Sequence, residues 1–198
     1  LKKPFSYVVA YNSFPQEANV YAIDGSLIKK VNETPLMEIM PKGFSSTRPG
    51  KRMLTWRADK PNTLFFVQAL DGGDASKPAD FRDELFTWEY PFSAEPKSLT
   101  KVKDRFAGII WGNDTYALVS SSWYDTRNSK SFVLNPTSGD TRLLVDRNSQ
   151  DVYSHPGNVH RERNQFGTFS MFINKDKTYW VGAGHTKEGE FPFIDELD

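Results

Sequence analysis

The chain repeats one pattern in order, a long apolar hairpin followed by a more polar hairpin. Each apolar hairpin joins two aromatic-rich segments across a turn of Asn, Asp, Lys or Gly residues, which favour tight turns. The three apolar hairpins span Arg52–Gly73, Phe106–Trp123 and Gly167–His185. Their turns recur roughly every 50–60 residues, a period typical of the four-stranded blades of a β-propeller.

The polar hairpins follow the apolar ones at matching places. Two are complete, at Glu84–Val102 and Lys130–Asp146, and "FPFIDELD" at the end of the chain starts a third. A similar phrase, "YAIDGSLIKKVN", occurs near the beginning, and we expect the preceding "FSYVVAYN" to be a strand of the same frame. The glycine at the tip of the second polar hairpin, Gly139, is expected to serve a backbone of positive φ rather than a ligand.

These patterns predict an all-β chain, a partial β-propeller made of consecutive four-stranded antiparallel blades. Whole blades are expected at about Pro41–Thr100 and Lys101–Asp146, with partial blades at about 1–40 and 147–198. A β-sandwich of irregular hairpins remains the alternative. Because both ends fall inside blades, we expect the chain to be a piece of a longer polypeptide or to need a partner that closes the ring, and its open strand edges to favour self-association.

Composition excludes several classes of partner and chemistry. The 25 basic residues are balanced by 25 acidic ones, so nothing attracts the chain generally to nucleic acid or to an acidic membrane. No apolar stretch is long enough for a membrane helix, and no signal peptide is recognisable. The chain has no cysteine, which excludes disulfides and thiolate chemistry.

The sequence contains no recognisable motif for catalysis or metal binding, and we predict no catalytic residue, no metal site and no cofactor. The string "GFSST" lacks the second glycine of a nucleophile elbow, and "HRERN" has the wrong spacing for a zinc helix. "NKDKTYWVG" begins like a calcium loop but is interpreted as a hairpin turn. The acidic groups Asp80–Asp83–Glu84 and Asp195–Glu196–Asp198 are interpreted as solvated loop carboxylates, and His155 and His160 as exposed loop residues.

The aromatic residues offer a second class of candidate. Trp56, Trp111, Trp123 and Trp180 lie on the apolar hairpins, where packing between blades explains them better than a ligand does. Trp123 and Tyr124, with Arg127 nearby, fall at the end of a predicted strand, where propeller mouths gather ligand contacts. An arginine at that place could hold a carboxylate through two hydrogen bonds.

The ordered strings "LTWRADKPNTLFFVQALDGGD", "RDELFTWEYPFSAEPKSL", "RFAGIIWGNDTYALVSSSWYDTR" and "GHTKEGEFPFIDELD" resemble the N-terminal propeller of exported serine peptidases of the prolyl oligopeptidase family, nearest to its glutamyl-endopeptidase-like subgroup. The resemblance covers about Pro41 to Asp198. It implies a propeller that caps a C-terminal α/β-hydrolase domain of the same polypeptide, with the catalytic triad in that domain.

The resemblance also implies a function for the propeller and a cellular location for the parent protein. The propeller would gate the entry of peptide substrates, and the parent protein would be periplasmic or secreted. Preference for glutamate would need a cationic pocket, for which Arg82, Arg105 and Arg127 are the candidates. The paired glutamates of the dipeptidyl-peptidase branch have no counterpart here, which puts that specificity in doubt. A propeller scaffold that binds a protein partner or a glycan remains the alternative function.

Overall fold

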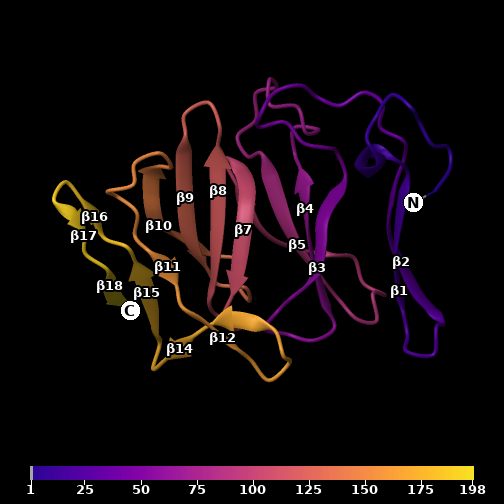
Figure 1. Cartoon of the computed structure of the whole chain (residues 1–198). Coiled ribbons are helices and arrows are strands. Elements are labelled where there is room, and N and C mark those ends of the chain that lie inside the picture. Colours follow the sequence, from indigo (N-terminus) through magenta and orange to yellow (C-terminus); the bar gives the residue numbers. More distant parts are fainter. Residues whose placement is uncertain (1) are drawn as a thin grey trace.

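Almost all regular structure in this chain is β-strand. The computed structural model describes residues 2–198, in which the single helical element is a short 3-10 turn, η1 (Tyr11–Ser13). The strands pair almost entirely with their neighbours in sequence, so that the sheets follow one another along the chain (Figure 1). The predicted all-β class is therefore confirmed.

Two complete four-stranded sheets form the middle of the molecule. The first contains β3 (Lys51–Trp56), β4 (Thr63–Ala69), β5 (Asp83–Glu89) and β6 (Lys97–Val102). The second contains β7 (Arg105–Trp111), β8 (Ala117–Trp123), β9 (Asn128–Leu134) and β10 (Thr141–Asn148). Each sheet is an antiparallel meander in which the strands lie in sequence order, as in a propeller blade.

Smaller sheets flank this pair. Before it, β1 (Gln16–Tyr21) pairs with β2 (Leu27–Thr34). After it, β15 (Lys177–Gly182) pairs with β11 (Asn158–Val159), β14 (Ile173–Asn174) and β18 (Phe193–Leu197). Two short hairpins complete the chain, β12 (Arg161–Arg163) with β13 (Phe169–Met171), and β16 (His185–Thr186) with β17 (Gly189–Glu190).

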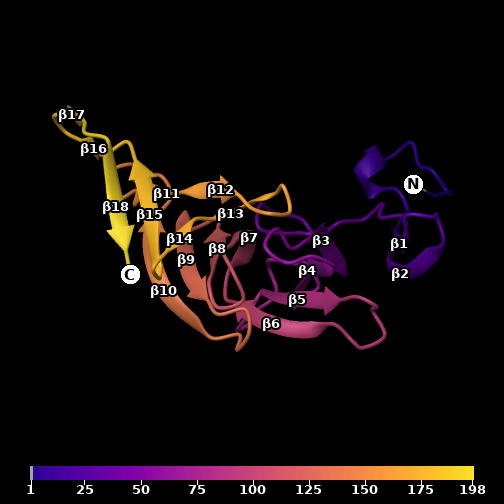
Figure 2. The same cartoon turned by 90° about the horizontal axis from the view of Figure 1, so that it is seen from below.

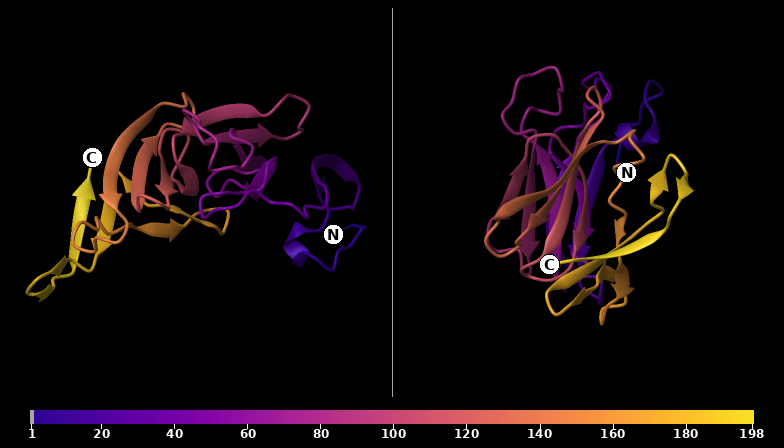
Figure 3. Two further views of the ribbon diagram at one scale, coloured as in Figure 1. Left: turned by 90° about the horizontal axis from the view of Figure 1, so that it is seen from above. Right: turned by 90° about the vertical axis from the view of Figure 1, so that its left-hand side faces the viewer.

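The sheets succeed one another along an arc that does not close within residues 2–198 (Figures 2 and 3). Viewed from below, β3 lies on the concave side of the arc and β6 on the convex side (Figure 2). The chain is thus a partial propeller built of consecutive four-stranded blades.

The continuous apolar run of β4 is explained by burial on both faces of its sheet. Phe65 and Val67 point toward the β7–β10 sheet, whereas Leu64 and Phe66 pack toward β1 and β2. Alternate residues of a strand face opposite sides, so a strand between two neighbouring sheets is apolar at every position. The continuous apolar run of β4 therefore indicates a strand whose sheet is covered by a neighbouring sheet on each face.

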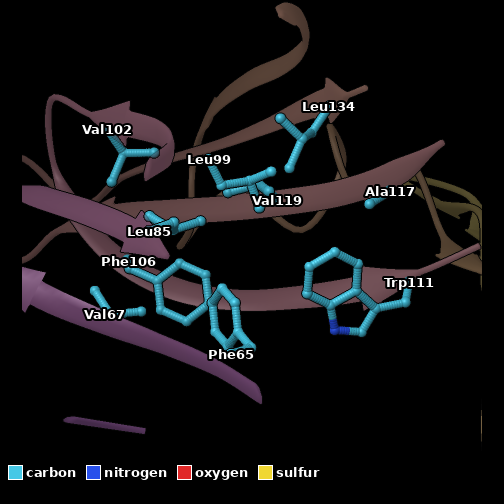
Figure 4. Packing of buried hydrophobic residues seen from close by; sticks show 10 residues of the cluster. All are labelled: Phe65, Val67, Leu85, Leu99, Val102, Phe106, Trp111, Ala117, Val119 and Leu134. Carbon is cyan, nitrogen blue, oxygen red and sulfur yellow. The ribbon is translucent and has the colours of Figure 1, made fainter. Parts of the chain in front are cut away.

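A cluster of ten buried residues joins the two complete sheets (Figure 4). It contains Phe65, Val67, Leu85, Leu99 and Val102 from the first sheet, and Phe106, Trp111, Ala117, Val119 and Leu134 from the second. Phe65 contacts Phe106 and Trp111, with ring centroids 5.6 and 5.5 Å apart. The face-to-face burial of the two sheets is the main apolar contact that holds them together.

The tryptophans divide between core and surface. Trp111 belongs to the cluster between the complete sheets, and Trp180 packs with Leu118 in the next cluster, as predicted. The expectation is wrong for Trp56, which is 48% exposed and lies against Phe92 with ring centroids 6.4 Å apart. Trp56 is the last residue of β3, which is an edge strand of its sheet.

The beginning of the chain also differs from the prediction. The segment Phe5–Asn12, expected to be a strand, contains no strand and enters the η1 turn. Most of its apolar side chains are exposed, including Tyr7 and Val8, so the position of this segment before a polar hairpin was a misleading signal.

The tip of the β9–β10 hairpin contacts the outer strand of the preceding blade. Gly139 has φ +83°, and a Cβ atom built on it would overlap the carbonyl oxygen of Leu99 in β6. Beside it, the Lys97 ammonium donates to the carbonyl oxygen of Thr137, 2.9 Å away. The positive φ predicted for Gly139 is confirmed, and the close approach to β6 is a second reason for a glycine.

Candidate functional site

Loops at one end of the two complete sheets enclose a pocket. Because neighbouring strands are antiparallel, β3 and β7 begin at this end while β4 and β8 finish there, at the upper edge of the molecule in Figure 1. The cavity has a volume of about 480 Å³. We call it the entry pocket, and its lining includes Phe44, Ser45, Arg52, Met53, Arg105, Trp123, Tyr124 and Arg127.

The segment leading into β3 is fixed to its surroundings at three points. The Ser45 carbonyl oxygen accepts a hydrogen bond from Arg105 Nε at 2.6 Å, and the Ser45 hydroxyl oxygen accepts one from the Tyr124 amide at 3.1 Å. The Thr47 amide donates to the carbonyl oxygen of Gly73 at 2.9 Å. One wall of the entry pocket is therefore held by β7, by the β8–β9 turn and by the β4–β5 loop.

A buried carboxylate, Asp83, lies beneath this wall at the start of β5. Its side chain is fully buried and accepts hydrogen bonds from Arg52 in β3, from Arg105 Nη1 at 3.1 Å and from the Phe106 amide at 2.7 Å. These partners come from both complete sheets, so the hydrogen bonds and ion pairs of Asp83 connect the two blades. They add to the apolar contacts of the buried cluster between the same sheets.

A second buried carboxylate, Asp71, extends the network into the β4–β5 loop. It accepts from Arg105 Nη2 at 2.6 Å, from Arg82 Nη1 at 2.9 Å and from the Gly73 amide at 2.9 Å. Burial alone would raise the pKa of Asp71, but the hydrogen bonds from Arg105 and Arg82 outweigh it and hold the pKa below its ordinary value of 3.8. Asp71 thus stays ionised at neutral pH and keeps both arginine partners.

Two of the predicted substrate contacts are engaged in this network. Arg105 lines the entry pocket, yet its guanidinium is bound to Asp71, Asp83 and two carbonyl oxygens. Arg82 binds Asp71, and its guanidinium carbon lies 4.6 Å from the ring centroid of Trp123. In the described structure both arginines hold the walls of the pocket together.

The other three predicted contacts come together at the β8–β9 turn. Trp123 ends β8 under Arg82, and the next residue, Tyr124, stacks on Phe44 with ring centroids 4.0 Å apart. The Arg127 guanidinium carbon lies 3.6 Å from the centroid of the Tyr124 ring. Among residues 2–198 no carboxylate forms an ion pair with Arg127.

Sequence reasoning missed the buried half of the site. Asp83 was expected to be a solvated loop residue, and this expectation is wrong because Asp83 belongs to β5. Its side chain shares the inward face of the strand with Leu85 and Thr87, and this alternation was the signal that could have revealed it. Arg52, Asp71 and Phe44 were not singled out at all, since their partners lie far away in sequence.

The remaining candidates have ordinary structural roles. The calcium-like string forms the tight turn between β14 and β15, as predicted, with positive φ at Lys175 and Asp176. The His160 ring lies 3.2 Å from a carboxylate oxygen of Glu162 and is exposed, and His155 accepts a hydrogen bond from the Gly157 amide. Within residues 2–198 there is no group of three side chains able to hold a metal ion.

No helix in the described part of the chain, residues 2–198, has the length and apolar character needed to cross a membrane.

Comparison with known proteins gives two curated relatives that carry the same name. The chain is 38% identical over 208 residues to "Probable glutamyl endopeptidase, chloroplastic" of Arabidopsis thaliana, and 38% identical over 207 residues to a protein of the same name from Oryza sativa subsp. japonica. All of this chain is matched, but it spans only 22% of the length of each relative. No protein-family model matches the chain, and neither does any solved structure. Along its whole length the chain is therefore similar to a segment of proteins named as peptidases.

Proposed function

We propose that this chain is the non-catalytic propeller segment of a serine peptidase of the prolyl oligopeptidase family. In this proposal it gates and positions peptide substrates for an α/β-hydrolase domain elsewhere in the same polypeptide. The observation that carries the proposal is the match of the entire chain to about a fifth of two proteins named glutamyl endopeptidase.

The architecture supports a gating role. Blades that are joined by a continuous apolar cluster and by a buried ionic network move little relative to one another, so an opening that they formed together with further blades would have a nearly fixed width. A rigid opening admits extended peptides and excludes folded proteins without a conformational change. The hydrolase domain would supply the serine nucleophile and the base that activates it.

The proposal includes the location of the parent protein. The two relatives are named as chloroplastic, which places those proteins in an organelle. For the protein that contains this chain we propose export from the cytosol, to the periplasm or the outside of the cell.

The gate can be tested by substrate size. We expect the longer polypeptide carrying this segment to cleave a short glutamate-containing peptide but to leave the same sequence intact when a folded protein displays it in a rigid loop. The measurement is kcat/KM for both substrates, with the carrier protein unfolded as the control that restores cleavage. Equal rates on the peptide and on the folded carrier would contradict gating by the propeller.

A further inference from the structure

We propose that a second pocket, between the outer parts of the two complete sheets, binds a medium-chain fatty acid through its carboxylate and its apolar tail. The cavity has a volume of about 310 Å³ and shares no lining residue with the entry pocket. Part of its lining comes from β6 and β10, the outer strands of the two sheets on the convex side of the arc (Figure 2). We call it the outer pocket, and the binding proposed for it does not depend on the gating function.

Apolar side chains from both sheets line the outer pocket. Val102 and Val119 belong to the buried cluster between the sheets, and Phe132 and Leu143 continue the lining on β9 and β10. Leu143 is 50% exposed and Phe81, from the loop before β5, is 38% exposed. The facing sheets therefore leave part of their apolar surface uncovered at this outer edge, which favours a ligand with an apolar body.

A hydroxyl group without a hydrogen-bond partner lies in this apolar lining. Ser121 lines the outer pocket from β8, two residues after Val119 and so on the same face of the strand. The residue is only 1% exposed, and its Oγ has no hydrogen-bond partner within residues 2–198. An unpaired buried hydroxyl destabilises the fold, and alanine at this position would avoid that cost. Because a serine side chain turns between staggered rotamers, a ligand in the pocket can supply the missing hydrogen bond.

The charged groups of the outer pocket favour an anion. Its lining contains three lysines and one carboxylate, namely Lys101, Lys103, Lys130 and Asp104. Lys130 pairs with Asp104 at 3.2 Å, and Lys101 lies 4.0 Å from a carboxylate oxygen of Glu84. Lys103 is exposed in the turn between β6 and β7 and forms no ion pair within residues 2–198. The lining therefore has a surplus of positive charge, and Lys103 is the lysine left to pair with a ligand carboxylate.

The strand register places the polar groups of the pocket at one end. Ser121 in β8 lies opposite Lys130 in β9, and Lys130 pairs with Asp104. Lys103 precedes Asp104 in the same turn. A carboxylate at this end of the pocket could therefore accept a hydrogen bond from the Ser121 hydroxyl and interact with the Lys103 ammonium, as charge-assisted hydrogen bonds require.

The apolar lining continues along the strands from this polar end. Val119 lies opposite Phe132, which lies opposite Leu143 of β10. Thr141 also lines the pocket, and in this register it is four residues from Ser121, about 13 Å along the strands. A polar group at one end and an apolar surface of this length fit a molecule with a charged head and an unbranched tail. We therefore assign the outer pocket to a fatty acid of about the length of octanoate.

Titration calorimetry on this chain tests the assignment with three probes. Octanoate, octanamide and butanoate differ from one another in the charge of the head or in the length of the tail. We expect octanoate to bind at least about 10-fold more tightly than octanamide, because only the carboxylate forms hydrogen bonds of a charged group. Butanoate should also bind at least about 10-fold more weakly than octanoate, because it buries fewer methylene groups.

Two neighbouring serines of β8 provide a matched pair of variants. Ser121→Ala should weaken octanoate binding about 10-fold, while the unfolding midpoint in urea stays unchanged or rises because an unpaired buried hydroxyl is removed. Ser120 lies on the opposite face of β8, where its hydroxyl oxygen is 3.3 Å from that of Ser131, so Ser120→Ala should leave octanoate binding unchanged. A purely structural Ser121 would alter the urea midpoint without altering the affinity for octanoate.

A variant of Lys103 tests the charge at the polar end. Lys103→Gln keeps a side chain of similar length but removes the ammonium group. It should reduce the preference for octanoate over octanamide by about 3-fold, as expected for a single pair of exposed charges.

Three results would overturn the proposal: no saturable binding of octanoate, equal binding of octanoate and octanamide, or full affinity for octanoate in Ser121→Ala. Binding of an acidic, apolar peptide without binding of octanoate would also overturn it, and would identify the outer pocket as a contact for a protein partner. Since cleavage is not measured, failure here leaves the gating test above unaffected.

Discussion

Replacing Asp83 by alanine should lower the free energy of unfolding by about 3–5 kcal/mol, the usual cost of removing one partner from a buried ion pair. Asp83 supplies the only side-chain hydrogen bond of Arg52 in the described structure, and it also binds Arg105 and the Phe106 amide. The substitution leaves a buried guanidinium and a buried amide without acceptors. Urea unfolding followed by tryptophan fluorescence measures the change.

The other end of the same strand offers the control. Glu89 ends β5 and pairs with Lys60 at 2.7 Å, but its side chain is largely exposed, so Glu89→Ala should cost about 1 kcal/mol or less. If Asp83→Ala does not fold, Asp83→Asn keeps the shape and one acceptor and should give an intermediate loss. Equal stability of the Asp83 and Glu89 variants would show that the buried network does not hold the blades together.

The second large effect is expected at the tip of the β9–β10 hairpin. In Gly139→Ala, the positive φ costs about 1–2 kcal/mol. The new methyl group also overlaps the carbonyl oxygen of Leu99, which adds about 1–3 kcal/mol of overpacking. We therefore expect a total loss of about 2–5 kcal/mol, because the hairpin must move away from the preceding blade.

A variant of Gly25, in the β1–β2 turn, distinguishes the cost of the positive φ from the cost of the steric overlap. Its φ of +84° equals that of Gly139 within a degree, but a Cβ there would meet no atom within 4 Å. Gly25→Ala should thus show only the backbone cost of about 1–2 kcal/mol. Similar urea midpoints for the two variants would contradict a tight contact between the hairpin tip and β6.

The order of hairpins could be predicted from sequence because it depends on local chemistry. Turns such as Gly112–Asp114 and the Asn135–Asp140 tip use residues that favour tight turns, and each connects the strands expected. The β16–β17 hairpin and the pairing of β11 with β15 were not anticipated, since β11, β16 and β17 have only two residues each and no pattern to reveal them.

The site was only partly predictable. Trp123, Tyr124 and Arg127 are neighbours in sequence, so their position after a strand was enough to group them. Asp83 meets Arg52 across 31 residues, and Ser45 meets Tyr124 across 79. The first contact crosses β4 within one sheet, and the second joins two blades. No local pattern in the sequence specifies either of them. The segment Phe5–Asn12 shows the converse, because its place in the repeated frame predicted a strand that the structure does not form.

We propose above that this chain is the non-catalytic part of a serine peptidase. Labelling with a fluorophosphonate probe, which reacts with activated serines, tests it most directly. We predict that the longer polypeptide carrying this segment is labelled and that the 198-residue chain alone, at the same or higher concentration, is not. Labelling of the isolated chain, or no labelling of the longer polypeptide, would show that the catalytic serine is not supplied by the rest of that polypeptide.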